Sequence, residues 1–194
     1  MFRHLARHPQ IVAPDTKEID FFSCPSRFAR GLAINHSHFP RRRRAGDDVR
    51  TFEASPDYLA SEPAAARICD YRPDMRLVAL LRDPVERAYS AWRMYRDYHR
   101  ADPDWFDQWE RRCDGDGSIG AFERRPATFG RDFVADLHDE LAARRSGATI
   151  EMPVIHHGFY RDQLEPYVAL FPREQLLVER SEDYLADPVA VLRR

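Results

Sequence analysis

Arg82 stands where a cation could meet an anionic ligand. It directly follows an apolar run at 77–81 and precedes Asp83 and Pro84. A guanidinium presents a planar fork of N–H donors, which suits a phosphate or a carboxylate. The alternative is a surface arginine that pairs with Asp83 or Glu86, and the local pattern leaves both interpretations open.

The residues on either side of Arg82 predict a strand, a tight turn and a helix. The continuous apolar run at 77–81 is typical of a central strand that is buried on both faces of a parallel sheet. Asp83 is a favourable N-cap, Pro84 suits the first helical position, and Glu86 completes the spacing of a capping box. Helical spacing continues to about His99, with an apolar face of Val85, Ala88, Tyr89, Trp92 and Tyr95. Ligands of open α/β sheets bind at the carboxyl ends of strands and near helix N-termini, which is where Arg82 is expected.

The rest of the chain alternates between predicted strands and helices. We expect strands at 18–22, 49–53 and 175–179, helices at 2–8, 63–70, 129–145 and 158–170, and further helix starts at Ser181 and Asp187. Residues 23–48 are predicted to be rich in loops. The alternation predicts one α/β domain over residues 1–194, with helices on both faces of a parallel sheet.

Composition and charge narrow the classes of function. Hydrophobic residues make up 43% of the 194 residues, which is enough for a buried core, and the net charge of -2 gives no indication of nucleic-acid binding. His36 and His38 flank a serine, but a solvated loop is the better interpretation there, so no metal is expected.

Cysteine usage and hydropathy predict a compartment. Cys24, Cys69 and Cys113 are odd in number and widely spaced, which favours free thiols in a reducing environment. The sequence shows neither a signal peptide nor an apolar run of membrane-spanning length. We therefore expect a cytoplasmic protein without a membrane segment.

Four segments, taken in order, resemble the PAPS-dependent sulfotransferases, particularly the heparan-sulfate-type branch and its bacterial relatives. They are HPQIVAPDTKEIDFF (8–22), FEASPDYL (52–59), LRDPVERAYSAW (81–92) and GFYRDQLEPYVALFPREQLLVERSEDYLADP (158–188). The resemblance implies a three-layer fold like that of the P-loop NTPases, with a central parallel sheet. It also implies transfer of a sulfuryl group from PAPS to a hydroxyl or amine of a carbohydrate-like acceptor, without a metal.

The resemblance assigns roles to named residues. Arg82 and Ser90 match the pair that binds the 3'-phosphate of PAPS. Without the resemblance, Ser90 would be interpreted as a small residue at a contact between a helix and the sheet. Glu18 matches the catalytic base of the 3-O-sulfotransferase-like branch, and Glu53 matches the base proposed for the N-sulfotransferase-like branch. Each glutamate could instead be bonded to a turn amide or an arginine, and Glu18 ranks slightly first. Asp20 replaces a family histidine and Ala54 a family lysine, and both changes bear on acceptor specificity.

One family element is not found in the sequence. The Gly-rich loop that holds the 5'-phosphosulfate has no counterpart in the 194 residues. The sequence therefore predicts a sulfotransferase domain that is truncated at both ends, binds PAP weakly and transfers sulfate poorly. The alternative is a degenerate, non-catalytic protein that binds PAP weakly or acts as an interaction module. A nucleotide kinase is disfavoured, because the motifs for its lysine and for Mg²⁺ binding are missing.

Overall fold

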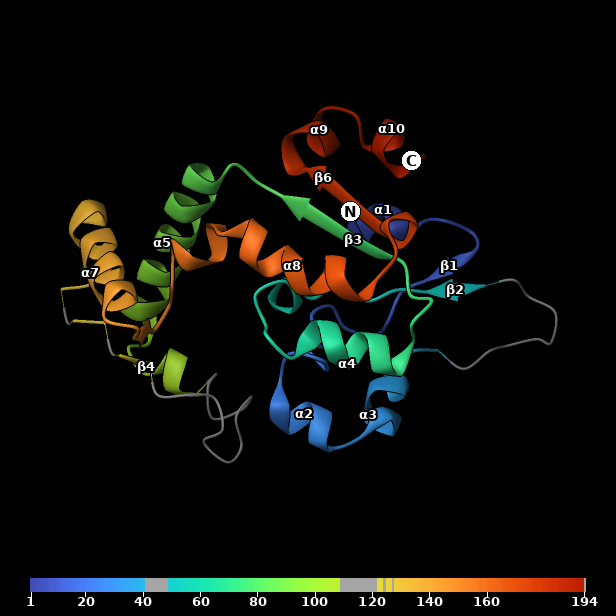
Figure 1. The fold of residues 1–194 in the computed structure, drawn as a ribbon, viewed down its shortest axis with the longest axis horizontal. Helices are drawn as coiled ribbons and strands as arrows, with labels where there is room; N and C mark the ends of the chain where they lie inside the picture. Colours follow the sequence, from blue (N-terminus) through green and yellow to red (C-terminus); the bar gives the residue numbers. More distant parts are fainter. Residues whose placement is uncertain (41–48, 109–121, 124, 127, 194) are drawn as a thin grey trace. The chain divides into compact units, whose positions relative to one another are not determined.

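The computed structural model describes residues 1–40, 49–108, 122–123, 125–126, 128–193 (Figure 1). Contacts divide the chain into an N-terminal unit, Met1–Met75, and a C-terminal unit, Arg76–Arg194. The single domain expected over residues 1–194 stays a prediction.

The N-terminal unit is built from short elements. Its strands β1 (Ile11–Val12) and β2 (Arg50–Thr51) pair in parallel. Its helices are α1 (Phe2–Leu5), α2 (Pro25–Ala29), α3 (Leu32–Ser37), the 3-10 turn η1 (Pro56–Tyr58) and α4 (Ala64–Tyr71). The helix expected at 63–70 is confirmed, whereas the stretch expected to be rich in loops contains α2 and α3.

Aromatic side chains form the core of the N-terminal unit. Phe21 is 1% exposed, and its ring lies 5.1 Å from that of Phe22 and 5.3 Å from that of Phe28. The Phe22 ring also contacts those of Tyr58 and Tyr71. Burial of these large rings stabilises a unit that has little regular sheet.

The strand predicted at 18–22 is wrong. Glu18 has φ 62° and Asp20 has φ 53°, so two residues of this segment adopt the left-handed conformation. A strand needs extended backbone at successive residues. Left-handed residues at positions 18 and 20 bend the backbone, so this segment cannot form the regular hydrogen bonds of a sheet. The Arg27 guanidinium donates hydrogen bonds to the carbonyls of Glu18 and Ile19, so this bent backbone is held from the side by α2.

The C-terminal unit contains the predicted strand before Arg82. Strand β3 (Leu77–Leu81) pairs in parallel with β6 (Leu176–Arg180), with Leu77 opposite Leu176 and Leu81 opposite Arg180 (Figure 1). The expected burial on both faces is wrong, because Val78 is 49% exposed and no residue of β3 is fully buried. Among the described residues β3 pairs with one strand only. An apolar run in the sequence does not by itself indicate whether one or both faces of a strand are covered by other elements.

Helix α5 (Pro84–Ala101) begins as predicted. The Asp83 carboxylate accepts hydrogen bonds from the backbone N–H groups of Val85 and Glu86, at 3.0 and 2.9 Å. The reciprocal half of the capping box is different, since the Asp83 N–H donates to Glu182 in the first turn of α9 (Ser181–Ala186). This bond joins the turn after β3 to the helix that directly follows β6, the strand paired with β3.

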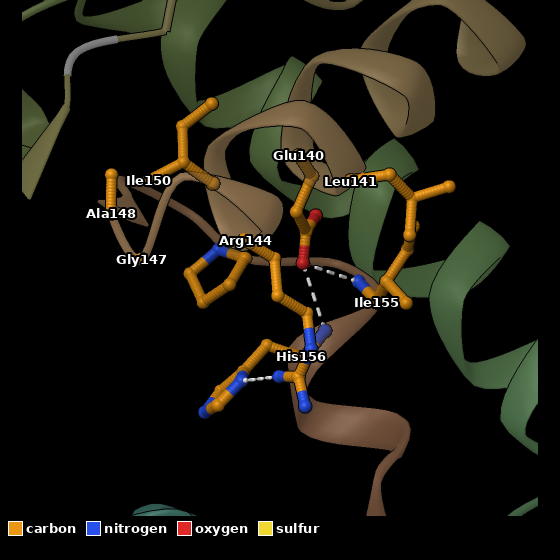
Figure 2. Close-up of a pocket in the computed structure, with 9 residues that line it drawn as sticks. Glu140, Leu141, Arg144, Gly147, Ala148, Ile150, Ile155 and His156 are labelled. Carbon is orange, nitrogen blue, oxygen red and sulfur yellow. Dashed lines mark hydrogen bonds between the residues drawn. The ribbon is translucent and has the colours of Figure 1, made fainter.

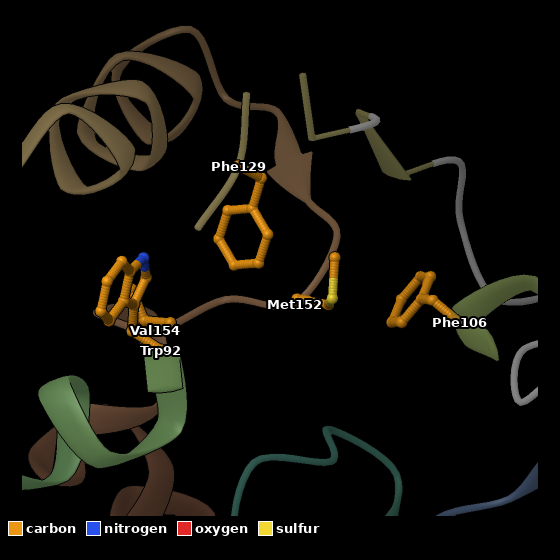
Figure 3. Packing of buried hydrophobic residues seen from close by; sticks show 5 residues of the cluster. All are labelled: Trp92, Phe106, Phe129, Met152 and Val154. Atoms are coloured by element: carbon orange, nitrogen blue, oxygen red, sulfur yellow. The ribbon is translucent and has the colours of Figure 1, made fainter. Parts of the chain in front are cut away.

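The C-terminal unit contains further short strands and helices and has a hydrophobic core cluster of its own. The further strands and helices are β4 (Phe122–Glu123), α7 (Phe133–Arg145), β5 (Thr149–Ile150), η2 (His156–Gly158), α8 (Tyr160–Leu170), η3 (Arg173–Gln175), α9 (Ser181–Ala186) and α10 (Pro188–Leu192). Strands β4 and β5 pair in parallel. The core cluster is made by Trp92, Phe106, Phe129, Met152 and Val154, with Phe129 between Trp92 and Met152 in Figure 3.

The predicted α/β class is confirmed. All three strand pairs of the described residues are parallel, and helices separate the strands along the chain. Cys24 and Cys69 are thiols, and Cys113 lies outside the described residues. Within the parts of the chain that the structure describes, no helix has both the length and the apolar character to cross a bilayer.

Candidate functional site

Arg82 lies at the carboxyl end of β3, as its place in the sequence predicts. Its side chain is 44% exposed and approaches Glu86 at 3.5 Å, which is the surface pairing considered as an alternative. A long ion pair between exposed side chains contributes about 0–1 kcal/mol, so an incoming phosphate could displace it at little cost. The Arg82 carbonyl accepts a 2.9 Å hydrogen bond from the Tyr160 hydroxyl, which ties the end of β3 to the first residue of α8.

Ser90 lies on α5, eight residues after Arg82. Its side chain is exposed, so the interpretation of Ser90 as a small residue at a helix–sheet contact is wrong. Arg82 and Ser90 thus belong to consecutive elements, β3 and α5, and both are open to solvent. That the two side chains share one phosphate stays a prediction.

Glu53 belongs to a hydrogen-bonded group in the N-terminal unit. Its Oε1 accepts hydrogen bonds from Ser55 Oγ at 2.6 Å and from the Tyr58 hydroxyl at 2.5 Å. Ser55 Oγ in turn accepts a 3.0 Å hydrogen bond from the Asp20 N–H. Burial raises the pKa of the Glu53 carboxyl, and the bonds from Ser55 and Tyr58 partly offset this rise. One oxygen of Glu53 is therefore already occupied by two donors.

Glu18 is the more accessible of the two candidate bases. Its side chain is 47% exposed and forms an ion pair with Lys17, the only lysine of the chain. It lines a cavity of about 320 Å³ in the N-terminal unit, together with Arg27 and Asn35. Its backbone is in the left-handed region, which is uncommon outside glycine and concentrates at functional sites.

Asp20 has a strongly perturbed environment that its sequence position alone did not reveal. Burial first, and then the charge of Asp57, raise the pKa of the Asp20 carboxyl to about 6. Oδ2 of Asp20 lies 3.4 Å from the Arg27 guanidinium, while its Oδ1 is buried and meets no donor among the described residues. A carboxyl with this pKa titrates in the range of histidine, the residue type that Asp20 replaces in the sulfotransferase-like pattern.

A second cavity, of about 350 Å³, lies in the C-terminal unit (Figure 2). Glu140 accepts hydrogen bonds from the backbone N–H groups of Ile155 and His156, and Arg144 donates to His156 Nδ1 at 3.0 Å. The Arg144 guanidinium also stacks on the Phe159 ring at 4.2 Å. The charged groups of this cavity are thus already paired within the protein.

The histidines of the N-terminal unit do not form a metal site in the described residues. His36, which lies in α3 and not in a loop, contacts the Tyr71 hydroxyl at 3.0 Å, and His38 Nδ1 lies 2.9 Å from Asp15. In the described ranges no three side chains of His, Cys, Asp or Glu are grouped so as to hold a metal ion.

Comparison with curated proteins finds sulfotransferases along the whole chain. The chain is 30% identical over 194 residues to heparan sulfate glucosamine 3-O-sulfotransferase 3B1 of Mus musculus, covering 100% of this chain and 40% of that protein. It is 26% identical over 197 residues to bifunctional heparan sulfate N-deacetylase/N-sulfotransferase 3 of Homo sapiens, covering 99% of this chain and 20% of that protein. No family model matches.

Comparison with solved structures gives the same family. A sulfotransferase from Alicyclobacillus acidocaldarius superposes with a TM-score of 0.66 at 27% identity, over 98% of this chain and 71% of that chain. At this identity and coverage the likeness extends to sequence as well as fold. The chain is therefore a relative of the sulfotransferases, in its sequence and in its α/β fold.

Proposed function

We propose that the protein is a PAPS-dependent sulfotransferase that moves a sulfuryl group to a hydroxyl or amine of a carbohydrate-like acceptor. The observation that carries this proposal is the alignment of 98% of the chain with a solved sulfotransferase. The names of the curated relatives, which specify heparan sulfate, support a carbohydrate-like acceptor.

In the proposed reaction, the acceptor oxygen or nitrogen attacks the sulfur of PAPS. The bond between sulfur and the bridging phosphate oxygen breaks, PAP leaves, and the acceptor proton passes to a carboxylate. By analogy with phosphoryl transfer, the protein mainly positions donor and acceptor and stabilises charge. Arg82 and Ser90 hold the 3'-phosphate in this scheme, through charged N–H donors and a hydroxyl.

Glu18 is the proposed base, ahead of Glu53. Glu18 lines a cavity and is half-exposed, so an acceptor can reach its carboxylate. Glu53 already accepts two hydrogen bonds on one oxygen and is better placed to orient Ser55 and Tyr58. A positioned general base contributes about 10²–10⁴-fold in rate, so Glu18→Gln should reduce transfer by about that factor if Glu18 carries the role.

Nucleotide binding provides the first test. PAP should bind more tightly than 5'-AMP, which lacks the 3'-phosphate, and Arg82→Ala should remove most of the difference. Loss of charged hydrogen bonds predicts about a 10–100-fold weakening. Arg76→Ala is the matched control, because Arg76 is an exposed arginine just before the same strand. Equal affinity for PAP and AMP in the unmodified chain would contradict the proposed donor site.

Transfer provides the second test. Sulfate is followed from radiolabelled PAPS to a panel of amino sugars, polysaccharides and phenols, with Glu18→Gln and Glu53→Gln beside the unmodified protein. Loss of transfer in Glu18→Gln alone supports the assignment of the base. PAP binding that depends on Arg82, with no transfer to any acceptor, would instead favour the non-catalytic alternative.

A further inference from the structure

The peptide group that joins Arg82 to Asp83 is held at both of its polar atoms by side chains from distant parts of the chain. Its carbonyl oxygen, on Arg82, accepts a 2.9 Å hydrogen bond from the Tyr160 hydroxyl at the start of α8. Its N–H group, on Asp83, donates a 3.1 Å hydrogen bond to Glu182 Oε1 in α9. Tyr160 and Glu182 are 78 and 99 residues away in sequence from the residues they bind, and all four belong to the C-terminal unit.

This pair of contacts fixes the plane of the peptide group. A peptide is planar, so its orientation is set once the directions of its C=O and N–H bonds are both held. Rotation of the plane would change ψ of Arg82 and φ of Asp83. Holding it therefore restricts the direction in which the Arg82 side chain leaves the end of β3.

The other hydrogen bonds of this turn do not hold the same peptide group. The Asp83 carboxylate caps the first turn of α5, and the Asp83 carbonyl accepts a 2.8 Å hydrogen bond from the Arg87 N–H. None of these bonds involves the Arg82 carbonyl or the Asp83 N–H. The Arg82 side chain itself makes only a long ion pair with Glu86 among the described residues. The orientation of the peptide group therefore depends on Tyr160 and Glu182.

Glu182 binds this group as a charged acceptor. The Asp83 N–H is the first cause that lowers the pKa of the Glu182 carboxyl, so the carboxylate is ionised at neutral pH. A hydrogen bond to an ionised acceptor is about twice as strong as one between neutral groups. Tyr160 and Glu182 both lie in the segment 158–188, to which the resemblance assigned no site residue.

We propose that Tyr160 and Glu182 are positioning residues for the donor nucleotide, which orient Arg82 so that its guanidinium meets the 3'-phosphate of PAP. Neither side chain contacts the nucleotide; each acts through the backbone of Arg82. The inference rests on the donor role of Arg82 in the proposed function. Because Arg82 is oriented before the nucleotide arrives, less conformational entropy is lost on binding, which raises affinity.

The first test needs no ligand. In the ¹⁵N-labelled 194-residue protein, the NMR order parameter of the Asp83 amide should be about 0.85, the value of rigid backbone. Tyr160→Phe and Glu182→Ala should each lower it, and the double variant should bring it below about 0.6. Tyr98→Phe and Asp183→Ala are the matched controls, because both residues are exposed and lie on α5 and α9. A rigid Asp83 amide in the double variant would overturn the proposal.

The second test compares the affinities for PAP and 5'-AMP by calorimetry. Tyr160→Phe removes only a hydroxyl and should weaken PAP about 3–10-fold, while 5'-AMP changes by less than about twofold. In the Arg82→Ala background, Tyr160→Phe should have no further effect on PAP, because the hydroxyl acts through Arg82. Glu182→Gln should keep most of the affinity that Glu182→Ala loses, since the amide oxygen can still accept from the Asp83 N–H.

The outcomes separate positioning from structure and from the reaction. A lower Tm with equal weakening of both nucleotides would give Tyr160 a merely structural role and overturn the proposal. The same loss of PAP affinity with and without Arg82 would overturn it as well, because Tyr160 would then act elsewhere. No preference for PAP over 5'-AMP in the unmodified protein would refute the proposed function, whereas the order parameters would still decide whether Tyr160 and Glu182 orient Arg82.

Discussion

Glu140→Ala is expected to reduce the free energy of unfolding by about 3–5 kcal/mol, because it leaves a buried arginine without its counter-charge. The Arg125 and Glu140 side chains are 0% and 4% exposed, and their closest N and O atoms are 2.9 Å apart. The Arg125 guanidinium also donates to the carbonyls of Asp136, Glu151 and Met152. Removing the carboxylate therefore leaves the Arg125 guanidinium buried, without a counter-charge and without access to water.

The backbone after β5 depends on the same carboxylate. Glu140 accepts hydrogen bonds from the N–H groups of Val154, Ile155 and His156, at 2.7 to 2.8 Å. A buried donor left unsatisfied costs about 1–3 kcal/mol, although water that enters the new space would relieve part of this. The expected loss of about 3–5 kcal/mol in the free energy of unfolding is thus set by the ion pair. The three unsatisfied N–H groups favour a value near the upper end of this range.

Urea unfolding followed by circular dichroism measures this loss. Asp139→Ala is the matched control, since Asp139 is an exposed neighbour on α7, and it should change stability by less than about 0.5 kcal/mol. Glu140→Gln should fall between the two, because the amide oxygen can still accept N–H bonds. A loss of under about 1 kcal/mol in Glu140→Ala would refute the reasoning that this pair is buried and unrelieved.

Three further predictions test other parts of the fold. The pKa of Asp20 is raised from 3.8 to about 6, so the folded state binds the proton more tightly and stability should fall as pH rises through this window; the rise of roughly two pH units corresponds to about 3 kcal/mol at pH 7. Asp20→Asn should flatten this slope in urea midpoints measured from pH 4 to 7, and an unchanged slope would contradict the assigned pKa. Gly130→Ala should destabilise by at least about 1 kcal/mol, because Gly130 has φ 81° and an added Cβ would lie 2.4 Å from Arg96 Cγ; equal thermal midpoints would show that the loop adapts. Asp83→Ala should cost about 0.5–2 kcal/mol through loss of the α5 cap, and Asp83→Ser should restore most of it, whereas equal losses in both variants would argue against capping.

The sequence by itself determined the local elements around Arg82. An apolar run followed by Arg-Asp-Pro specifies a strand that ends at Leu81, just before Arg82, and a helix that starts at Pro84, because capping and proline geometry act within a few residues. The same reasoning predicts the start of α10 after Asp187, whose carboxylate accepts hydrogen bonds from the N–H groups of Val189 and Ala190. The ordered motifs also identified the sulfotransferase relationship, since they occur in the same order and are spread along nearly the whole chain, from residue 8 to residue 188.

Only the tertiary structure decided how the acidic residues are arranged. The segment at 18–22 has the alternating pattern of a strand, yet Arg27 and Ser55 hold its backbone in a bent conformation with left-handed residues. Partners 8 and 35 residues away make these bonds, so no local pattern could indicate them. The buried Asn35 side chain is a similar case. Its Oδ1 meets no hydrogen-bond donor among the described residues, and this depends on which side chains pack around it, which the residue type does not specify.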